Sequence, residues 1–195
     1  MGAGGERHEI RFCGSGGQGI ITAAIILAEA AGIYDGKQVS QTQSYGPEAR
    51  GGTCKAEVVI SNGEIDYPKA SRPDILLSMN QSSCETYFPD LKPDGLLIVD
   101  ASLVEKVPTS RVVSIPFTRI ARQQLGSEVV ATIVALGAVG YLCKDISLES
   151  LEKALITRVP KGTEEVNLRA LRAGIDAARR FDLCSLPETV WEDEE

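Results

Sequence analysis

Short apolar segments alternate with segments of helical pattern along most of the chain. Six segments predict β-strands, because they either alternate apolar with polar residues or are continuously apolar, and they span residues 9–12, 37–43, 55–60, 74–79, 96–99 and 111–115. The remaining patterned segments predict helices over residues 20–28, 84–88, 121–125, 129–143, 147–159 and 164–180. This alternation predicts an α/β fold, a three-layer α/β/α domain with a mixed, mostly parallel sheet.

A turn signal after the third predicted strand breaks the strand–helix alternation. Asn62-Gly63 is a pair preferred in type I′ turns, where both central residues have positive φ. The chain then returns through residues 64–67. We therefore expect one antiparallel β-hairpin, formed by residues 55–60 and 64–67, within the sheet.

A glycine-rich segment joins the first predicted strand to the first predicted helix. We call it the glycine loop, and it reads Gly14-Ser15-Gly16-Gly17-Gln18-Gly19. Glycine tolerates positive φ and lets backbone N–H groups come close to an anion, and the following helix directs the positive end of its dipole to the same place. The segment therefore predicts a binding site for an anionic ligand such as a phosphate.

Two other interpretations of the glycine loop remain open. The spacing of its glycines matches G-x-G-x-x-G, which is typical of dinucleotide sites. Such sites also need a carboxylate at the end of the second strand, and this chain has Thr42-Gln43-Ser44 there. Alternatively, the glycines serve only the close packing of the helix.

A second loop has too many turn formers to be a regular element, and it reads Tyr45-Gly46-Pro47-Glu48-Ala49-Arg50-Gly51-Gly52. Within it, Arg50 is the candidate ligand-binding residue, since a guanidinium can hold a phosphate or a carboxylate with two parallel hydrogen bonds. Glycines on both sides of this segment let the backbone approach the same ligand. In the alternative interpretation, Arg50 forms a structural ion pair with Glu48.

Composition and charge restrict the function. The chain has 195 residues, which suits a single domain over residues 1–195, and we expect its acidic end, from about residue 183 to residue 195, to be mobile. A formal net charge of −7 and an aromatic fraction of 5% disfavour nucleic acid and anionic membranes as partners. Because the sequence shows no signal peptide or spanning segment, we expect a cytoplasmic location.

Residues for catalysis and metal binding are scarce. His8 is the single histidine, so a Ser/His/Asp triad is not expected, and the G-x-x-x-x-G-K-[ST] phosphate loop is missing. Five cysteines are scattered without a C-x-x-C pair, which predicts that this chain alone holds no zinc ion and no iron–sulfur cluster. We therefore predict a binding domain with no catalytic residue and no metal site of its own.

The glycine loop, the 45–52 loop and their order resemble the gamma subunit of 2-oxoacid:ferredoxin oxidoreductases. The similarity extends to about Gly174 and includes Pro73-Asp74, Pro93-Asp94-Gly95, Leu136-Gly137-Ala138 and Glu165-Val166-Asn167-Leu168. Enzymes of this family convert a 2-oxoacid, coenzyme A and oxidised ferredoxin into an acyl-CoA, carbon dioxide and reduced ferredoxin. One departure is Thr132, which stands where the family commonly has asparagine.

The resemblance implies a division of labour among subunits. Thiamine diphosphate would lie between the alpha and beta subunits, and 4Fe-4S clusters would lie in the beta and delta subunits. The gamma subunit would contribute to the coenzyme A site and to assembly with alpha, beta and delta, and ferredoxin would accept the electrons. In isolation, the gamma chain would be able to form a homodimer. The residues implied to contact coenzyme A phosphates or to face the active centre are Gly14, Ser15, Gly16, Gly17, Gln18, Gly19, Tyr45, Arg50, Gly51 and Gly52.

The identity of the 2-oxoacid does not follow from this subunit, because within the family the same domain also occurs in indolepyruvate oxidoreductases. We favour 2-oxoglutarate. Two further functions stay open: an NAD(P)-binding, Rossmann-like reductase, and a non-catalytic scaffold whose glycine loops only pack against other subunits.

Overall fold

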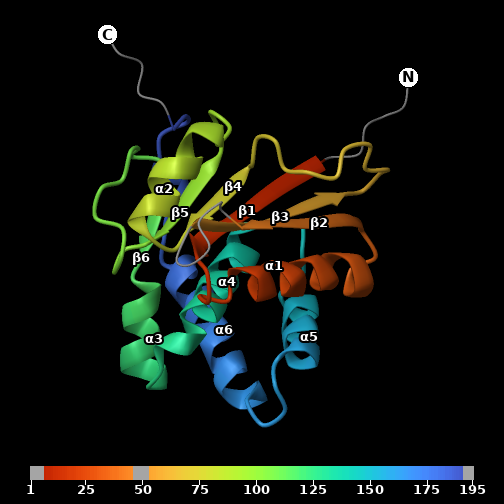
Figure 1. Cartoon of the computed structure of the whole chain (residues 1–195), viewed down its shortest axis with the longest axis vertical. Coiled ribbons are helices and arrows are strands. Elements are labelled where there is room, and N and C mark those ends of the chain that lie inside the picture. The colour runs from red at the N-terminus through yellow and green to blue at the C-terminus, as the bar shows by residue number, and fades with distance from the viewer. Residues whose placement is uncertain (1–6, 46–52, 191–195) are drawn as a thin grey trace.

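The computed structural model describes residues 7–45 and 53–190. In it, helices pack on both faces of a six-stranded sheet (Figure 1). The strand order is β2-β3-β1-β4-β5-β6. The strands are β1 Arg7–Ser15, β2 Gln38–Tyr45, β3 Thr53–Ser61, β4 Ile75–Ser78, β5 Leu96–Asp100 and β6 Val112–Ile115. The predicted α/β architecture is confirmed.

Strand β1 divides the sheet into two halves with different strand directions. On one side it pairs antiparallel with β3, which in turn pairs antiparallel with β2. On the other side, β1, β4, β5 and β6 run parallel. The prediction of a mixed, mostly parallel sheet is therefore confirmed, and the carboxyl ends of the parallel strands meet at one edge of the sheet.

The prediction that residues 55–67 form the hairpin is wrong. β3 pairs along its whole length with β2, and residues 64–67 do not form a strand. Beyond the turn, Ser40 Oγ donates to the Pro68 carbonyl at 2.9 Å, and the Arg7 guanidinium donates to the Tyr67 carbonyl. Because side chains already bond these carbonyls, and because proline has no N–H, this segment cannot extend the strand ladder.

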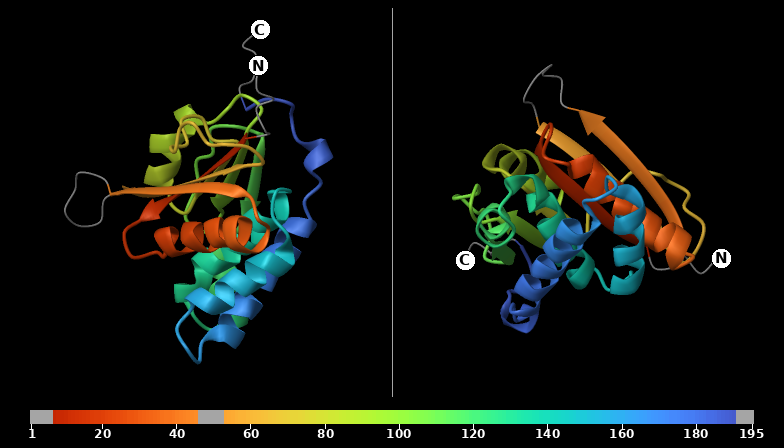
Figure 2. Two further views of the ribbon diagram at one scale, coloured as in Figure 1. Left: turned by 90° about the vertical axis from the view of Figure 1, so that its right-hand side faces the viewer. Right: turned by 90° about the horizontal axis from the view of Figure 1, so that it is seen from below.

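Helices cover the two faces of the sheet unequally. One face carries α1, α3, α4, α5 and α6, and the other carries the short α2 (Figures 1 and 2). The helices are α1 Ile20–Glu29, α2 Gln81–Tyr87, α3 Phe117–Leu125, α4 Ala131–Leu142, α5 Leu148–Arg158 and α6 Glu164–Arg179. Shorter turns are the π-helix Ala30–Tyr34 and the 3-10 helices Phe88–Asp90, Glu128–Val130 and Leu183–Ser185. Within the described ranges, none of the helices is both long and apolar enough to cross a bilayer.

Alternating side chains of β1 contribute to two separate cores. Ile10 and Phe12 point into the larger core beneath α1 and α4, while Cys13 belongs to a smaller core that Leu76 and Phe88 share beneath α2. Charged residues of β1, such as Arg11, take the second face of the strand and are nevertheless buried. The period of two expected for a strand thus explains why both faces of β1 are covered.

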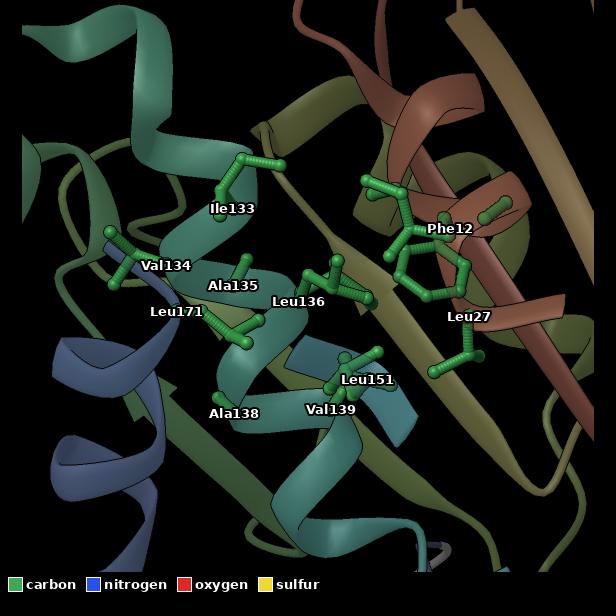
Figure 3. Packing of buried hydrophobic residues seen from close by; sticks show 14 of the residues in the cluster. Phe12, Leu27, Ile133, Val134, Ala135, Leu136, Ala138, Val139, Leu151 and Leu171 are labelled. Carbon is green, nitrogen blue, oxygen red and sulfur yellow. The ribbon is translucent and has the colours of Figure 1, made fainter. Parts of the chain in front are cut away.

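The larger core is built around α4, which is apolar on all sides and buried at every residue except Tyr141. Figure 3 shows Leu136 and Val139 of α4 directed toward Phe12 and Leu27, while Val134 lies beside Leu171 of α6. A Cβ on Gly137 would lie less than 3.0 Å from the Leu171 carbonyl oxygen, and a Cβ on Gly174 would lie equally close to that of Val134. The two helices therefore cross with their backbones in contact.

The C-terminal segment follows α6 toward the α2 side of the sheet. Val190 is 2% exposed, belongs to the smaller core and donates its N–H to the Pro93 carbonyl at 2.7 Å. Of the tail predicted from about residue 183, residues 191–195 lie outside the described residues. The predictions of a single domain and of a mobile tail stay predictions.

Candidate functional site

The glycine loop turns the chain from the carboxyl end of β1 into α1. Gly17 has φ 88° and Gly19 has φ 82°, a region that L side chains rarely adopt. Gly19 is the N-cap of α1, and no side chain from the described part of the chain caps this helix. The N–H groups of Ile20, Ile21 and Thr22, in the first turn of α1, have no acceptor within the helix and are therefore available to a ligand.

Hydrogen bonds within the glycine loop and from α4 hold it in shape. The Ser15 N–H donates to Oε1 of Gln18 at 2.6 Å, and the Gln18 N–H donates to the Ser15 carbonyl at 3.2 Å. From the first turn of α4, the Thr132 hydroxyl donates to the Gln18 carbonyl. A Cβ on Gly14 would lie 2.5 Å from Oε1 of Gln18, so this glycine makes room for the glutamine side chain.

Beside Gly16 and Gly17 the described residues leave the space open, since a Cβ on either would meet none of their atoms within 4 Å. A hollow of about 370 Å³ lies here, lined by the glycine loop, the first turn of α1 and Cys54. None of the described residues that line it is charged. The polar groups that it offers are backbone N–H groups and the hydroxyls of Ser15 and Thr22, which suits an anionic ligand.

A second hollow, of about 420 Å³, lies on the α4 side of the glycine loop. Met79, Leu103 and Val129 give it an apolar wall, and Val129 is 87% exposed. Arg122 and Glu128 form an ion pair at this hollow. The glycine loop thus stands between two hollows that each combine polar and apolar groups, which suits a ligand that has both phosphate and less polar parts.

The four buried cysteine thiols, those of Cys13, Cys54, Cys84 and Cys143, are poorly suited to metal binding, whereas Cys184 is exposed. Burial raises the pKa of Cys54, raises the pKa of Cys84 and Cys143 to about 11, and raises the pKa of Cys13 well above its ordinary value. A thiol that stays protonated at neutral pH is a weak metal ligand and a weak nucleophile. In the part of the chain that the structure describes, no three His, Cys, Asp or Glu side chains are grouped as metal ligands would be.

Part of the predicted site lies outside the described residues, namely residues 46–52 with Arg50, Gly51 and Gly52, and the side chain of Tyr45. The two ends of this loop are described. Tyr45 pairs with Cys54, which pairs with Gly14, and Thr53 pairs with Ser15. The sheet therefore brings the stems of both predicted loops together at one edge, as a shared site requires.

The strand order does not suit the NAD(P) interpretation. In a dinucleotide-binding fold the second strand lies next to the first, and the carboxylate at its end reaches the ribose. Here β3 lies beside β1, so its first residue, Thr53, takes that position, and β2 is one strand further away. Among the described residues, neither the end of β2 nor Thr53 supplies the ribose-binding carboxylate.

Sequence reasoning did not identify Asn80, which binds the glycine loop from the end of β4. Its Nδ2 donates to Oγ of Ser15 at 2.7 Å, and its Oδ1 accepts from the Ser83 N–H at 2.8 Å. The available signal was its position directly after a buried parallel strand, because the carboxyl ends of such strands share an edge. Thr132 was noted as a departure, but its contact with Gln18 was not expected.

Comparison with known proteins gives consistent matches over most of the chain. The family model described as pyruvate ferredoxin/flavodoxin oxidoreductase matches residues 9–177. The 2-oxoglutarate synthase subunit KorC of Methanocaldococcus jannaschii is 51% identical over 179 residues, which cover 90% of this chain and 96% of that subunit.

Solved structures give the same picture. The gamma subunit of a keto/oxoacid ferredoxin oxidoreductase from Geobacter sulfurreducens has a TM-score of 0.82 and 46% identity, covering 89% of this chain and 97% of that one. A 2-oxoglutarate:ferredoxin oxidoreductase from Magnetococcus marinus, solved with 2-oxoglutarate, coenzyme A and succinyl-CoA bound, has a TM-score of 0.79. It is 24% identical, with 91% of this chain and 32% of that chain covered, and so shares the fold.

Proposed function

Since this chain belongs to the pyruvate ferredoxin/flavodoxin oxidoreductase family and is the gamma subunit of a 2-oxoacid:ferredoxin oxidoreductase, we propose that its glycine loop binds phosphate groups of coenzyme A. The observation that carries this proposal is the open hollow beside Gly16 and Gly17, bordered by the uncapped first turn of α1. The Magnetococcus structure, which contains bound coenzyme A and a domain of this fold, supports it.

In this proposal the subunit binds and orients coenzyme A and does not react with it. Backbone N–H groups of Gly17, Gly19 and the first turn of α1 hold phosphate oxygens, because they point the positive end of the helix dipole at the anion. The apolar wall at Met79 and Val129 takes a less polar part of the same ligand. Binding energy gained at these remote groups then helps to position the reacting thiol elsewhere in the complex.

We also propose that the redox cofactors are held by other subunits, with thiamine diphosphate between alpha and beta and 4Fe-4S clusters in beta and delta. The described cysteines do not suit a cluster, because they are not grouped and because burial keeps the thiols of Cys13, Cys84 and Cys143 protonated. The group-transfer chemistry would come from thiamine diphosphate when it is bound in the complex. We place this assembly in the cytoplasm.

For the substrate we propose 2-oxoglutarate. The support is the 51% identity to a subunit named for 2-oxoglutarate synthase. The complex purified with its alpha, beta and delta subunits is assayed with 2-oxoglutarate, pyruvate and 2-oxoisovalerate in parallel, with coenzyme A and oxidised ferredoxin. A higher kcat/KM for either of the other two acids contradicts the assignment.

The coenzyme A proposal is tested with two glycines that share a conformation. Gly17 and Gly162 both have φ 88° and open space around a Cβ, but Gly162 lies in the turn between α5 and α6, away from both hollows. Alanine at either position would have to adopt the same positive φ. We expect Gly17→Ala, and not Gly162→Ala, to raise the KM for coenzyme A of the complex. Equal KM values for the two variants would contradict the proposal.

A further inference from the structure

The direction of one hydroxyl group at the glycine loop follows from its hydrogen bonds. Resting on the proposed function, we infer that Asn80 is a positioning residue that turns the Ser15 hydroxyl toward a phosphate oxygen of coenzyme A. Ser15 would then be a side-chain donor in a site otherwise made largely of backbone N–H groups.

The orientation of the Asn80 amide is determined by its neighbour in α2. A backbone N–H can only donate, so the atom of Asn80 that lies 2.8 Å from the Ser83 nitrogen must be the oxygen Oδ1. The NH₂ group therefore faces Ser15. This group can only donate, so Oγ of Ser15, at 2.7 Å, must be the acceptor.

A hydroxyl that accepts from Asn80 keeps its single hydrogen for another partner. Among the described residues, no acceptor of this hydrogen lies within hydrogen-bond distance. Ser15 lines the hollow of about 370 Å³, which provides room for an external acceptor. The Ser15 hydroxyl is therefore a donor prepared for a ligand, and a phosphate oxygen is the acceptor with which it forms a strong, charge-assisted hydrogen bond.

Two hydroxyls on the other side of the glycine loop differ, because their hydrogens are used within the protein. The Thr132 hydroxyl donates to the Gln18 carbonyl, and the Thr118 hydroxyl donates to Oδ2 of Asp100 at 2.5 Å. These two groups hold the glycine loop and α3 in place. The Ser15 hydroxyl, in contrast, accepts a hydrogen bond from Asn80 and keeps its own hydrogen, which it can donate to the ligand.

Asn80 is held rigidly enough for this role. Its carbonyl accepts the Cys84 N–H at 3.2 Å in the first turn of α2, and the Met79 N–H before it donates to the Cys13 carbonyl of β1 at 2.9 Å. Both sides of the Asn80–Ser15 hydrogen bond are thus attached to neighbouring parallel strands. A donor fixed in this way loses little freedom when the ligand binds.

The test is a double-mutant cycle in the purified oxidoreductase complex. Asn80→Ser keeps an N-cap for α2, because serine accepts the Ser83 N–H, but it is too short to reach Ser15 at the same time. Ser15→Ala removes the donor itself. The measured quantities are kcat, the KM for coenzyme A, the inhibition constant of desulfo-coenzyme A and the melting temperature of the complex.

Each single variant is expected to raise the KM and the inhibition constant about tenfold, the size of one hydrogen bond to a charged group, with little change in kcat. The double variant is expected to be no worse than Ser15→Ala, because Asn80 acts through Ser15. The inference is overturned if Asn80→Ser leaves the KM unchanged while Ser15→Ala raises it, or if the two effects multiply to about a hundredfold.

Two further variants keep the test decisive. If Asn80→Ser lowers the melting temperature, Asn80→Asp is used in its place, because aspartate also caps α2. The aspartate would accept the Ser15 hydrogen and keep it from the ligand, so the KM for coenzyme A should rise at least as much. A KM unchanged by Asn80→Asp overturns the inference. Gly17→Ala distinguishes the role of Asn80 from the coenzyme A site itself. If Gly17→Ala raises the KM for coenzyme A and Asn80→Ser does not, only the role of Asn80 is refuted. If neither variant raises the KM, the coenzyme A site is refuted as well.

Discussion

At the crossing of α4 and α6, a Cβ on Gly137 or Gly174 would lie less than 3.0 Å from backbone of the opposite helix, whereas a Cβ on Gly16 or Gly17 would meet no atom within 4 Å. The same residue type therefore has two different roles in one chain. At the crossing, glycine lets two helices pack in contact and supports the fold. In the glycine loop it leaves space unfilled, and space that the folded chain leaves open next to uncapped N–H groups is available to a ligand.

The largest expected effect breaks the helix crossing. Gly174→Ala should lower the free energy of unfolding by about 3 kcal/mol or more, because α4 and α6 must separate to admit a methyl group between their backbones. Denaturant unfolding of the chain measures it, with Gly16→Ala as the matched control. A loss below about 1 kcal/mol would mean that the crossing adapts easily.

The opposite result is expected in the glycine loop. Gly16→Val adds a side chain to the open hollow, and it should change the free energy of unfolding by less than about 0.5 kcal/mol while raising the KM for coenzyme A about tenfold. Unchanged kinetics together with a complex that dissociates in gel filtration would instead favour a scaffold role for the loop.

A smaller effect is expected at the contact that links the two regions. Thr132 belongs to α4, and its hydroxyl donates to the Gln18 carbonyl of the glycine loop. Thr132→Val keeps the shape but removes the donor, so the free energy of unfolding should fall by about 1 kcal/mol. Thr86→Val, which removes an exposed intrahelical hydroxyl bond to Ser82, is the control. Equal losses for the two variants would contradict a specific role for Thr132.

Acid titration separates the glycine loop from the rest of the fold. The side chains of Gln18, Asn80 and Thr132, which hold the loop, carry no titratable group, whereas Asp35 does. Burial alone would raise the pKa of Asp35, but hydrogen bonds from Ser150 and Ser147 at the start of α5 outweigh it, and the pKa is lowered. A carboxylate with a lowered pKa stabilises the fold above its unfolded pKa, and this stability is lost as the pH falls through the folded value.

The measurable consequence concerns Asp35→Asn. This variant should be less stable than the parent chain near neutral pH, and the difference should shrink as the pH falls below about 4. Asp94→Asn, at an exposed position of the β4–β5 connection, is the control. A difference between parent and Asp35→Asn that stays constant down to pH 3 would refute the assignment.

Most helices and strands could be predicted from the sequence, but not which strands pair with each other. Apolar runs such as residues 96–99 and the helical pattern of residues 147–159 reflect burial that any packing of the chain must satisfy. The hairpin was assigned wrongly because Asn62-Gly63 is a local signal, whereas the pairing of β3 with β2 depends on a longer matching strand across a loop.

The candidate site shows the same limit. The glycine loop could be located from its residues and its place between a strand and a helix. Asn80 and Thr132, however, contact it from 65 and 114 positions away in the chain. Such contacts depend on the strand order and on where α4 begins, and neither can be predicted from the pattern of neighbouring residues.

The central place of β1 has a consequence for biosynthesis. β1 is made first, yet both of its neighbours, β3 and β4, come later, and β4 ends only at Ser78. At synthesis rates of about 5 to 20 residues per second, both edges of β1 stay unpaired for several seconds on the ribosome. Charged residues at Arg7, Glu9 and Arg11 then separate the apolar ones along this exposed strand, and charges of this kind discourage nascent chains from pairing with one another.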